Sequence, residues 1–553
     1  MKKILAIMIA LIVLTASIGW SFRVEILLGV IEYRFSSIEV SEPRDIPWKQ
    51  GPSASTTASL ERPPNIILIV ADDLGYNDIS TFGGGIVQTP SIDRLAKEGA
   101  VFNQSYSGAS TCAPSRAMMM TGRYPTRTGF EFTPTPAGMG KAVSFISGGM
   151  DNNLPPGFYD EEMEANQPSY QLKGLPPEEI TIAETLKDSG YYTAHIGKWH
   201  LGNDNGMAPH EQGFDDSLLM TSGLYLPEDD LNVVNAKIPF DPIDKFLWKA
   251  MTYSNSFNSG DGNRFKPKGY LTDYWTDESI NVIKANKNRP FFLYLAHWGP
   301  HTPLQATRED YEAVGDIRPH RKRVYAAMVR AIDRSVGRVL DTLDQEGLAD
   351  NTLVMFTSDN GGAGYIGIPE VNQPFRGWKI TMFEGGLRVP MMIKWPSKIT
   401  AGTVVDTPVA HIDVMPTLAA AAASQSKATE IDGVNILPLA TSQGDQNWDR
   451  ETLFWQNGHY QVVRHGDWKL QVNDRPTDGL QHWLFDLAKD PTEQNNLAAV
   501  RQDKVNELKG LLVDHQANAV GALYPATTQM PVMVDKTLAE SFEEGDEYVY
   551  TPN

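Results

Sequence analysis

The chain contains a single cysteine, Cys112, and its surroundings indicate reactive chemistry. With one cysteine among 553 residues, an intramolecular disulfide and a cysteine-rich zinc site are both excluded. A lone cysteine is usually a small, buried apolar side chain. In a chain that leaves the cytoplasm, as argued below, an unpaired thiol needs another explanation. The segment around it reads Ser110-Thr111-Cys112-Ala113-Pro114-Ser115-Arg116 and precedes Thr121-Gly122-Arg123.

Carboxylate and amide side chains form a second candidate site, for a metal ion. Asp72 and Asp73 are adjacent, and their carboxylates repel each other unless they are solvated or joined by a cation. Asp359 and the side-chain carbonyl of Asn360 add further oxygen ligands. Hard cations prefer such ligands; calcium takes about six or more of them, whereas magnesium usually retains several waters. The set therefore predicts one calcium ion bound by Asp72, Asp73, Asp359 and Asn360.

Each of these groups follows an apolar run that is typical of a buried strand. The runs span residues 66–70, 290–296 and 352–357. Asp72 and Asp73 follow the first run, His297 and His301 the second, and Asp359 the third. Asp and Asn are also ordinary turn formers, which is the alternative for any one segment taken alone. Because ligands bind outside the carboxyl ends of strands in open α/β sheets, the joint placement favours one shared site.

Strands alternate with amphipathic helices through most of the chain. Residues 180–189 and 324–343 have helical spacing of their apolar side chains. We therefore expect an α/β domain over residues 65–440, with a large mixed, mostly parallel sheet flanked by helices. Farther on, apolar runs flank His465-Gly466-Asp467, which predicts a hairpin. This pattern predicts a smaller C-terminal α+β subdomain on an antiparallel sheet over residues 441–553.

The N-terminus predicts export. Two lysines precede an uncharged apolar run from Ile4 to Phe22, which is typical of a secretory signal and near the ~20 residues that span a bilayer. Residues 1–22 are therefore expected to be a signal peptide or a membrane anchor. Either places the rest of the chain outside the cytoplasm, in the periplasm, at the cell surface or secreted. Residues 23–64 are expected to be a linker, in which the stretch rich in Pro, Ser and Thr from Pro43 to Thr57 is poorly ordered.

Composition excludes two classes of protein. The chain has 48 Lys and Arg against 68 Asp and Glu, a net charge of −20. A nucleic-acid binder needs a basic face, so no nucleic-acid partner is expected. A hydrophobic content of 41% supplies a core and argues against wholesale disorder. An anionic substrate stays compatible with the negative charge, because its attraction need only be local.

The pentapeptide Cys112-Ala113-Pro114-Ser115-Arg116 resembles the signature of the type I sulfatases, arylsulfatases and polysaccharide sulfatases of the alkaline phosphatase superfamily. The resemblance covers residues 65–553 and includes Gly197-Lys198-Trp199-His200-Leu201-Gly202, His301-Thr302-Pro303 and Arg376-Gly377-Trp378-Lys379. It implies metal ligands at Asp72, Asp73, Cys112, Asp359 and Asn360. It implies catalytic roles for Cys112, Arg116, Lys198, His200, His301 and Lys379. The family's usual Gly-Gly-Lys is replaced by Gly377-Trp378-Lys379.

The resemblance also implies a mechanism. A formylglycine-generating maturation enzyme oxidises Cys112 to an aldehyde (3-oxoalanine), which hydrates to a geminal diol. One hydroxyl, polarised by the metal, attacks sulfur and gives a covalent sulfate hemiacetal. His301 or Lys379 protonates the departing alcohol. The second hydroxyl then loses its proton to His200 and ejects sulfate. Cleavage of a sulfate ester needs positive charge around the sulfuryl group and a proton for the leaving oxygen.

We expect the substrate to be a sulfated polysaccharide or its oligosaccharides, because export and the insert at residues 148–170 suit such an enzyme. His210, His297 and Trp378 are expected to line the substrate pocket. Two alternatives stay open. One is a phosphate or phosphonate monoester hydrolase of the same superfamily. The other is a non-catalytic glycan-binding protein.

Overall fold

The computed structural model describes residues 22–54, 62–258, 262–428, 430–441, 448, 450–475 and 479–553. The expected signal peptide or anchor lies outside this part except for Phe22. Within the described ranges, no helix combines the length and the apolar character needed to cross a membrane.

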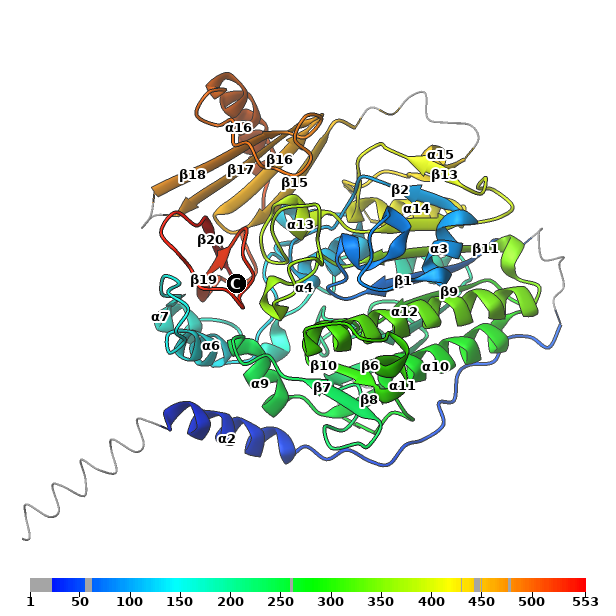
Figure 1. Ribbon diagram of the computed structural model, residues 1–553. Helices are drawn as coiled ribbons and strands as arrows, with labels where there is room; N and C mark the ends of the chain where they lie inside the picture. Colours follow the sequence, from blue (N-terminus) through cyan, green and yellow to red (C-terminus); the bar gives the residue numbers. More distant parts are fainter. Residues whose placement is uncertain are drawn as a thin grey trace, which may run out of the picture.

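A nine-stranded sheet forms the centre of the larger domain (Figure 1). Five neighbouring strands run parallel, whereas β12 and β8 run antiparallel to their neighbours. The large mixed, mostly parallel sheet is therefore confirmed. In spatial order the strands are β13 (Thr403–Val405), β2 (Ala100–Phe102), β12 (Met391–Lys394), β11 (Thr352–Ser358), β1 (Asn65–Ala71), β9 (Phe291–Ala296), β5 (Tyr192–Gly197), β6 (Asp216–Gly223) and β8 (Tyr253–Phe257).

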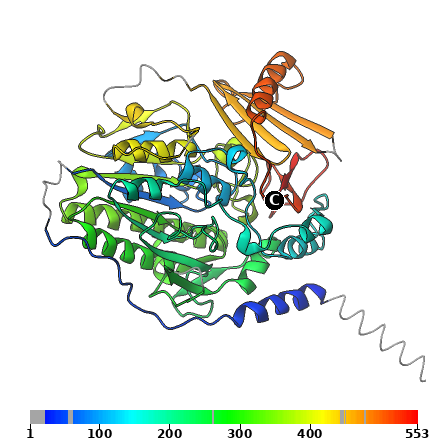
Figure 2. The same ribbon diagram turned by 180° about the vertical axis from the view of Figure 1, so that it is seen from behind.

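Helices cover both faces of this sheet, as the view from behind also shows (Figure 2). All of β1 is buried, and its side chains alternate between two cores. Ile67 and Ile69 pack in the core formed with α3 (Pro90–Lys97), α10 (Leu271–Asn286) and α12 (His320–Gln345). Ile66 and Leu68 pack in the core formed with α4 (Cys112–Thr121), α8 (Ile182–Asp188) and α14 (Val414–Ala421).

The C-terminal subdomain is built on a four-stranded antiparallel sheet, as expected. Its strands are β15 (Thr452–Asn457), β16 (Tyr460–His465), β17 (Trp468–Arg475) and β18 (Gly479–Asp486), and α16 (Gln502–Gln516) packs on one face. His465 pairs with Trp468, which confirms the predicted hairpin. A smaller sheet joins β19 (Thr528–Met533) to β20 (Tyr548–Pro552) and to β4 (Phe158–Tyr159), so the insert meets the C-terminal end of the chain.

Short elements complete the described chain. Two small sheets pair β3 (Ser105–Tyr106) with β14 (Val409–Ala410) and β7 (Val233–Ala236) with β10 (Leu304–Thr307). The remaining α-helices are α5 (Pro125–Thr128), α6 (Met139–Ser147), α7 (Glu161–Ala165), α9 (Pro242–Ala250), α11 (Arg308–Ala313), α13 (Glu384–Leu387) and α15 (Leu437–Ala440).

The expected linker is more ordered than its composition indicated. Residues 23–36 form the helix α2 (Arg23–Ser36), and Ile31 of this helix packs against Phe246 and Leu247 of α9. Farther along, Trp48 is buried, and its indole Nε1 donates a hydrogen bond of 2.7 Å to Glu278. The expectation of poor order is therefore wrong for residues 43–54, because Trp48 within this stretch docks on the domain. Residues 55–61 lie outside the described part.

Candidate active site

The carboxyl ends of parallel strands bring the predicted residues to one edge of the large sheet. Asp72 and Asp73 follow β1, Lys198 follows β5, and Asp359 follows β11. His301 lies in the loop after β9. The first residue of α4 is Cys112, which places this side chain at the positive end of a helix dipole.

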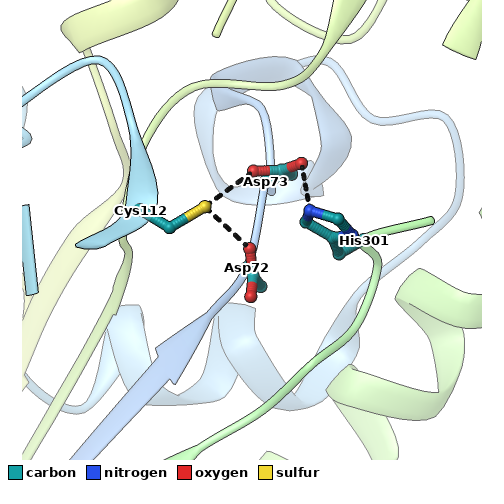
Figure 3. A group of neighbouring side chains, drawn as sticks. All are labelled: Asp72, Asp73, Cys112 and His301. Carbon is teal, nitrogen blue, oxygen red and sulfur yellow. Dashed lines mark hydrogen bonds and ion pairs between the residues drawn. The ribbon is translucent and has the colours of Figure 1, made fainter. Parts of the chain in front are cut away.

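Four side chains form the centre of the site (Figure 3). One ligand atom from each of Asp72, Asp73, Cys112 and His301 lies within 4.8 Å of the others. The sulfur of Cys112 is 3.5 Å from Oδ1 of Asp72 and 3.9 Å from Oδ1 of Asp73. On the other side of Asp73, its Oδ2 is 3.6 Å from Nε2 of His301.

Arg116 joins three strand ends next to this centre. Its side chain is fully buried, one helical turn after Cys112 on α4. The guanidinium donates from Nε to Asp359 at 2.8 Å and from Nη2 to Asp72 at 3.3 Å. A third donor, Nη1, reaches the carbonyl of Lys198 at 3.0 Å. This planar fork fixes the relative positions of β1, β5 and β11.

Two lysines bring further positive charge to the carboxylates. Lys198 Nζ lies 2.5 Å from Asp72, and Lys379 Nζ lies 2.7 Å from Asp73. Lys379 also donates to the sulfur of Cys112 at 3.1 Å. The three carboxylates of Asp72, Asp73 and Asp359 are thus matched in number by three cations, Arg116, Lys198 and Lys379. A divalent ion added to this balanced set would give the site a local charge of about +2, which attracts an anionic ester.

The ligand set fits a hard cation. Within the described part of the chain, Oδ1 of Asn360 is buried and has no hydrogen-bond partner, while Nδ2 of the same side chain donates to Asp73 at 2.7 Å. Burial, with the neighbouring charge of Asp359, raises the pKa of Asp72 to about 7. A buried carbonyl without a donor and a carboxylate that is costly to ionise are both relieved by a bound cation. The oxygen ligands at this site therefore suit a hard divalent cation.

The two histidines differ in their surroundings, and burial disfavours the charged form of each. Nδ1 of His301 donates to the carbonyl of Thr302 at 2.6 Å, which directs Nε2 toward Asp73. The ring stacks on Trp298 with centroids 4.0 Å apart. Burial lowers the pKa of both His301 and His200 well below the ordinary value, and the charge of Lys198 lowers that of His200 further. Nδ1 of His200 is buried without a partner among the described residues, so this ring is available to accept a proton.

Backbone strain accompanies this arrangement. His200 has φ +67° and Asp73 has φ +63°, which is the left-handed region that side chains other than glycine rarely adopt. Each such residue costs about 1 kcal/mol or more and is held in place by the structure around it. The strain therefore lies at two of the residues that the sequence predicted to be functional.

Comparison with known families and structures identifies the protein family of this chain. The family described as sulfatase matches residues 64–424. The chain belongs to the sulfatase family. It is therefore an enzyme that hydrolyses sulfate monoesters. A second family, described as N-sulphoglucosamine sulphohydrolase, C-terminal, matches residues 376–518 of this sulfatase.

Relatives of this sulfatase cover most of its length. N-acetylgalactosamine-6-sulfatase of Homo sapiens is 31% identical over 510 residues, which are 85% of this chain and 88% of that protein. A sulfatase of Formosa agariphila is 31% identical over 502 residues, with coverage of 81% and 86%. The crystal structure of Ps i-CgsB has a TM-score of 0.67 at 31% identity and covers 84% of this chain and 95% of that one. Ps i-CgsB is also solved in complex with k-i-k-neocarrahexaose.

The three residues expected to line the substrate pocket lie in different places. The prediction for His297 is wrong, because its side chain is fully buried and Nε2 is 2.9 Å from the hydroxyl of Ser335 on α12. Trp378 is 6% exposed and packs against the backbone of Gly364, so its indole belongs mainly to the core. His210 is exposed, and its role stays a prediction.

Sequence reasoning missed two aromatic residues of this sulfatase. The hydroxyl of Tyr365 donates to Oδ2 of Asp73 at 2.9 Å. Trp298 stacks on His301 and lies 4.7 Å below Nζ of Lys198. Trp298 follows His297 directly after a predicted strand, which is a signal that could have identified it. Tyr365 lies in the short 3-10 helix η6 (Gly364–Ile366) after Asp359, and its spacing in the sequence does not predict where its side chain points.

Proposed function

We propose that this sulfatase removes sulfate from a sulfated polysaccharide or its oligosaccharides, with Cys112 in the formylglycine form and one calcium ion. The observation that carries the proposal is the meeting of Cys112 with two adjacent carboxylates and three buried cations at one sheet edge. The carbohydrate substrate is supported by the similarity to Ps i-CgsB, which is solved with a neocarrahexaose.

The thiol of Cys112 is a poor nucleophile as it stands. Burial, followed by the nearby charge of Asp359, raises its pKa, so the sulfur stays protonated at neutral pH. Hydrated formylglycine supplies two hydroxyl groups on one carbon, one to attack sulfur and one to permit release of sulfate. The proposal therefore includes a maturation enzyme that converts Cys112.

The side chains around Cys112 stabilise the negative charge of the ester. Asp72, Asp73, Asp359 and Asn360 would hold the calcium ion, which would supply positive charge next to the sulfuryl oxygens. Lys198 and Lys379 are fixed by ion pairs with the carboxylates, so their ammonium groups are already oriented when the ester binds. Such preorganised charge is effective because it needs no rearrangement during the reaction.

Two proton transfers complete the cycle, and we assign them to the two histidines. An anionic sulfate ester beside His301 raises the pKa of this ring, and a proton on Nε2 can then pass to the departing sugar oxygen. Lys379 is less suited to this step, because its ammonium is engaged by Asp73 and lies 3.1 Å from Cys112, beside the nucleophile. Neutral His200, with its free Nδ1, accepts the proton that is released with sulfate.

The experiment that tests this function compares matched sulfate and phosphate monoesters. The purified enzyme should release sulfate from sulfated oligosaccharides of carrageenan, ulvan or chondroitin type and should hydrolyse 4-nitrophenyl sulfate faster than 4-nitrophenyl phosphate. Cys112→Ala should lose both sulfatase activities while keeping the folded circular dichroism spectrum. A preference for the phosphate ester, or wild-type turnover by Cys112→Ala, would overturn the proposal.

The metal and the location are proposals with tests of their own. Removal of the metal with a chelator should abolish sulfate release, and calcium should restore it better than magnesium, since the oxygen-rich set suits the larger ion. Full restoration by magnesium alone would contradict calcium. Residues 1–22 should direct the enzyme to the periplasm, cell surface or medium. Recovery of active enzyme only from the cytoplasm would contradict export.

A further inference from the structure

A small hollow lies beside His200, next to the active site. Its walls are the 3-10 helix η4 (Tyr170–Leu172), the following Lys173, and the loop that carries Asn203 and Asp204. His200 itself lines the hollow and comes two residues after Lys198, whose Nζ lies 2.5 Å from Asp72 in the active site. His200 therefore connects the hollow with the reacting centre.

Specific contacts hold the walls of the hollow in place. Nδ2 of Asn205 donates to the carbonyl of Gln171 at 3.0 Å, which ties the two walls together. Gly174 approaches the opposite loop so closely that an added Cβ would lie 2.4 Å from the carbonyl of Leu201. The insert after α6 thus ends on the hollow, and the hollow is a built part of the fold.

Lys173 is a nearly buried cation without a counter-ion. The residue is 4% exposed, and the groups next to its Nζ carry no charge: the carbonyl of Thr135 at 3.5 Å, Oε1 of Gln167, and the ring of Tyr524, whose centroid is 5.3 Å away. Among the described residues no carboxylate lies within ion-pair distance of it, and Glu164 acts on it only at longer range. Taking an unpaired ammonium out of water is unfavourable. A ligand that brings negative charge into the hollow removes this penalty.

We propose that Lys173 binds an anionic group, sulfate or carboxylate, on the sugar unit next to the one that loses its sulfate. This inference rests on the proposed function, because the neighbouring unit exists only in an oligosaccharide substrate. The hollow is small and admits a substituent better than a whole ring. Asp204 repels an anion and therefore suits sugar hydroxyl groups, as does Asn203. The ring of Tyr170, which is 36% exposed, offers an apolar face to the sugar.

The test measures binding to the Cys112→Ala enzyme, in which substrates stay intact. Two carrageenan oligosaccharides serve as a matched pair that differs only in a sulfate on the sugar next to the 4-sulfated galactose. A chondroitin 4-sulfate disaccharide supplies a carboxylate in its place. Adding Lys173→Met should weaken the binding of a ligand whose neighbouring sugar carries an anionic group about tenfold or more. The affinity for the ligand whose neighbouring sugar is neutral should not change. Lys173→Arg should retain most of the affinity.

A matched control separates this role from general electrostatics. Lys141 lies on α6, just before the insert, but is exposed and paired with Glu161 at 2.6 Å, so Lys141→Met should alter no affinity. If Lys173→Met lowers the affinity for the doubly sulfated ligand alone, the site binds sulfate. If it lowers the affinity for the chondroitin ligand alone, the site binds carboxylate. Equal losses for all ligands, or no loss for any, would overturn the inference.

The proposed function can fail separately from this inference. If the wild-type enzyme releases no sulfate from 4-nitrophenyl sulfate or any oligosaccharide, the proposed function fails. If it releases sulfate but Lys173→Met does not discriminate between the matched ligands, only the assignment of Lys173 fails.

Discussion

At the scale of single residues, the site separates charge stabilisation from proton transfer. Lys198 and Lys379 are locked to carboxylates and serve as fixed charges. His301 is held by Thr302 and Trp298, with Nε2 facing the centre, and no fixed cation is paired to it. Removing a fixed charge should therefore affect every ester alike, whereas removing the proton donor should affect only esters whose leaving group needs a proton.

We predict that His301→Gln acts differently on two kinds of substrate. Its kcat on a sugar sulfate should fall about 10²–10⁴-fold, because an alkoxide leaves poorly without a proton. Its kcat on 4-nitrophenyl sulfate should fall less than about tenfold, because nitrophenolate leaves unaided. Steady-state assays of the same preparation check both values. Lys379→Gln is the control, and its kcat should fall by a similar factor on the two substrates. If the kcat of His301→Gln also fell by a similar factor on both, His301 would not be the proton donor.

At the scale of elements, the C-terminal subdomain holds the segment that carries Lys379. Arg376 at one end of this segment pairs with Asp535 at 2.6 Å. Glu384 on α13 pairs with Lys469 on β17 at 2.9 Å, and Lys469 also pairs with Glu493 at 3.0 Å. These last three side chains are fully buried. The active-site segment is therefore positioned by charges that lie between 85 and 159 residues away in sequence.

We predict that Lys469→Met destabilises the protein by about 3–5 kcal/mol, because it leaves the carboxylates of Glu384 and Glu493 buried without a cation. Urea denaturation measures this change in the free energy of unfolding. Lys489→Met is the matched control: this lysine is 83% exposed and pairs with Asp486, so its loss should change stability by about 0.5 kcal/mol or less. Equal effects of the two substitutions would show that the buried cluster is not what stabilises the contact between the domains.

The predictions from sequence succeeded where structure is local and failed where it depends on distant partners. Buried strands are continuous apolar runs, so their ends and the residues after them, such as Asp72 and Asp359, could be placed. His297 was misplaced because two histidines follow the same strand, and nothing in their spacing tells which one turns into the core toward Ser335. Trp48 was assigned to a linker because its partner, Glu278, is 230 residues away.

At the scale of the whole molecule, acid stability depends on histidines that are buried in the neutral form. His195, His297 and His411 are fully buried, and burial lowers the pKa of each to about 3. Hydroxyl groups of Ser217, Ser335 and Ser115, respectively, lie 2.9 Å from their ring nitrogens. An unfolded histidine has a pKa near ~6.5, so below that pH the unfolded chain binds more protons than the native one.

The stability of the enzyme should therefore fall as pH drops from about 6.5 toward 3. Each of the three histidines costs about 1.4 kcal/mol per pH unit in this window, or about 2 kcal/mol at pH 5, and nothing above pH 6.5. Urea denaturation at pH 7.5 and 5.0 measures the loss. His297→Gln, whose amide can replace Nε2 toward Ser335, should lose less stability than wild type between these pH values. An unchanged pH dependence in this variant would contradict the assignment.

The central claim is that Cys112 acts only after conversion to formylglycine. Peptide mass spectrometry of the segment around Cys112, combined with sulfate release by the same samples, tests it most directly. Enzyme produced with and without a formylglycine-generating partner supplies a range of conversion. The account predicts that activity rises in proportion to the aldehyde fraction and vanishes in the sample that carries only the thiol. Full sulfate release by a thiol-only sample would contradict it.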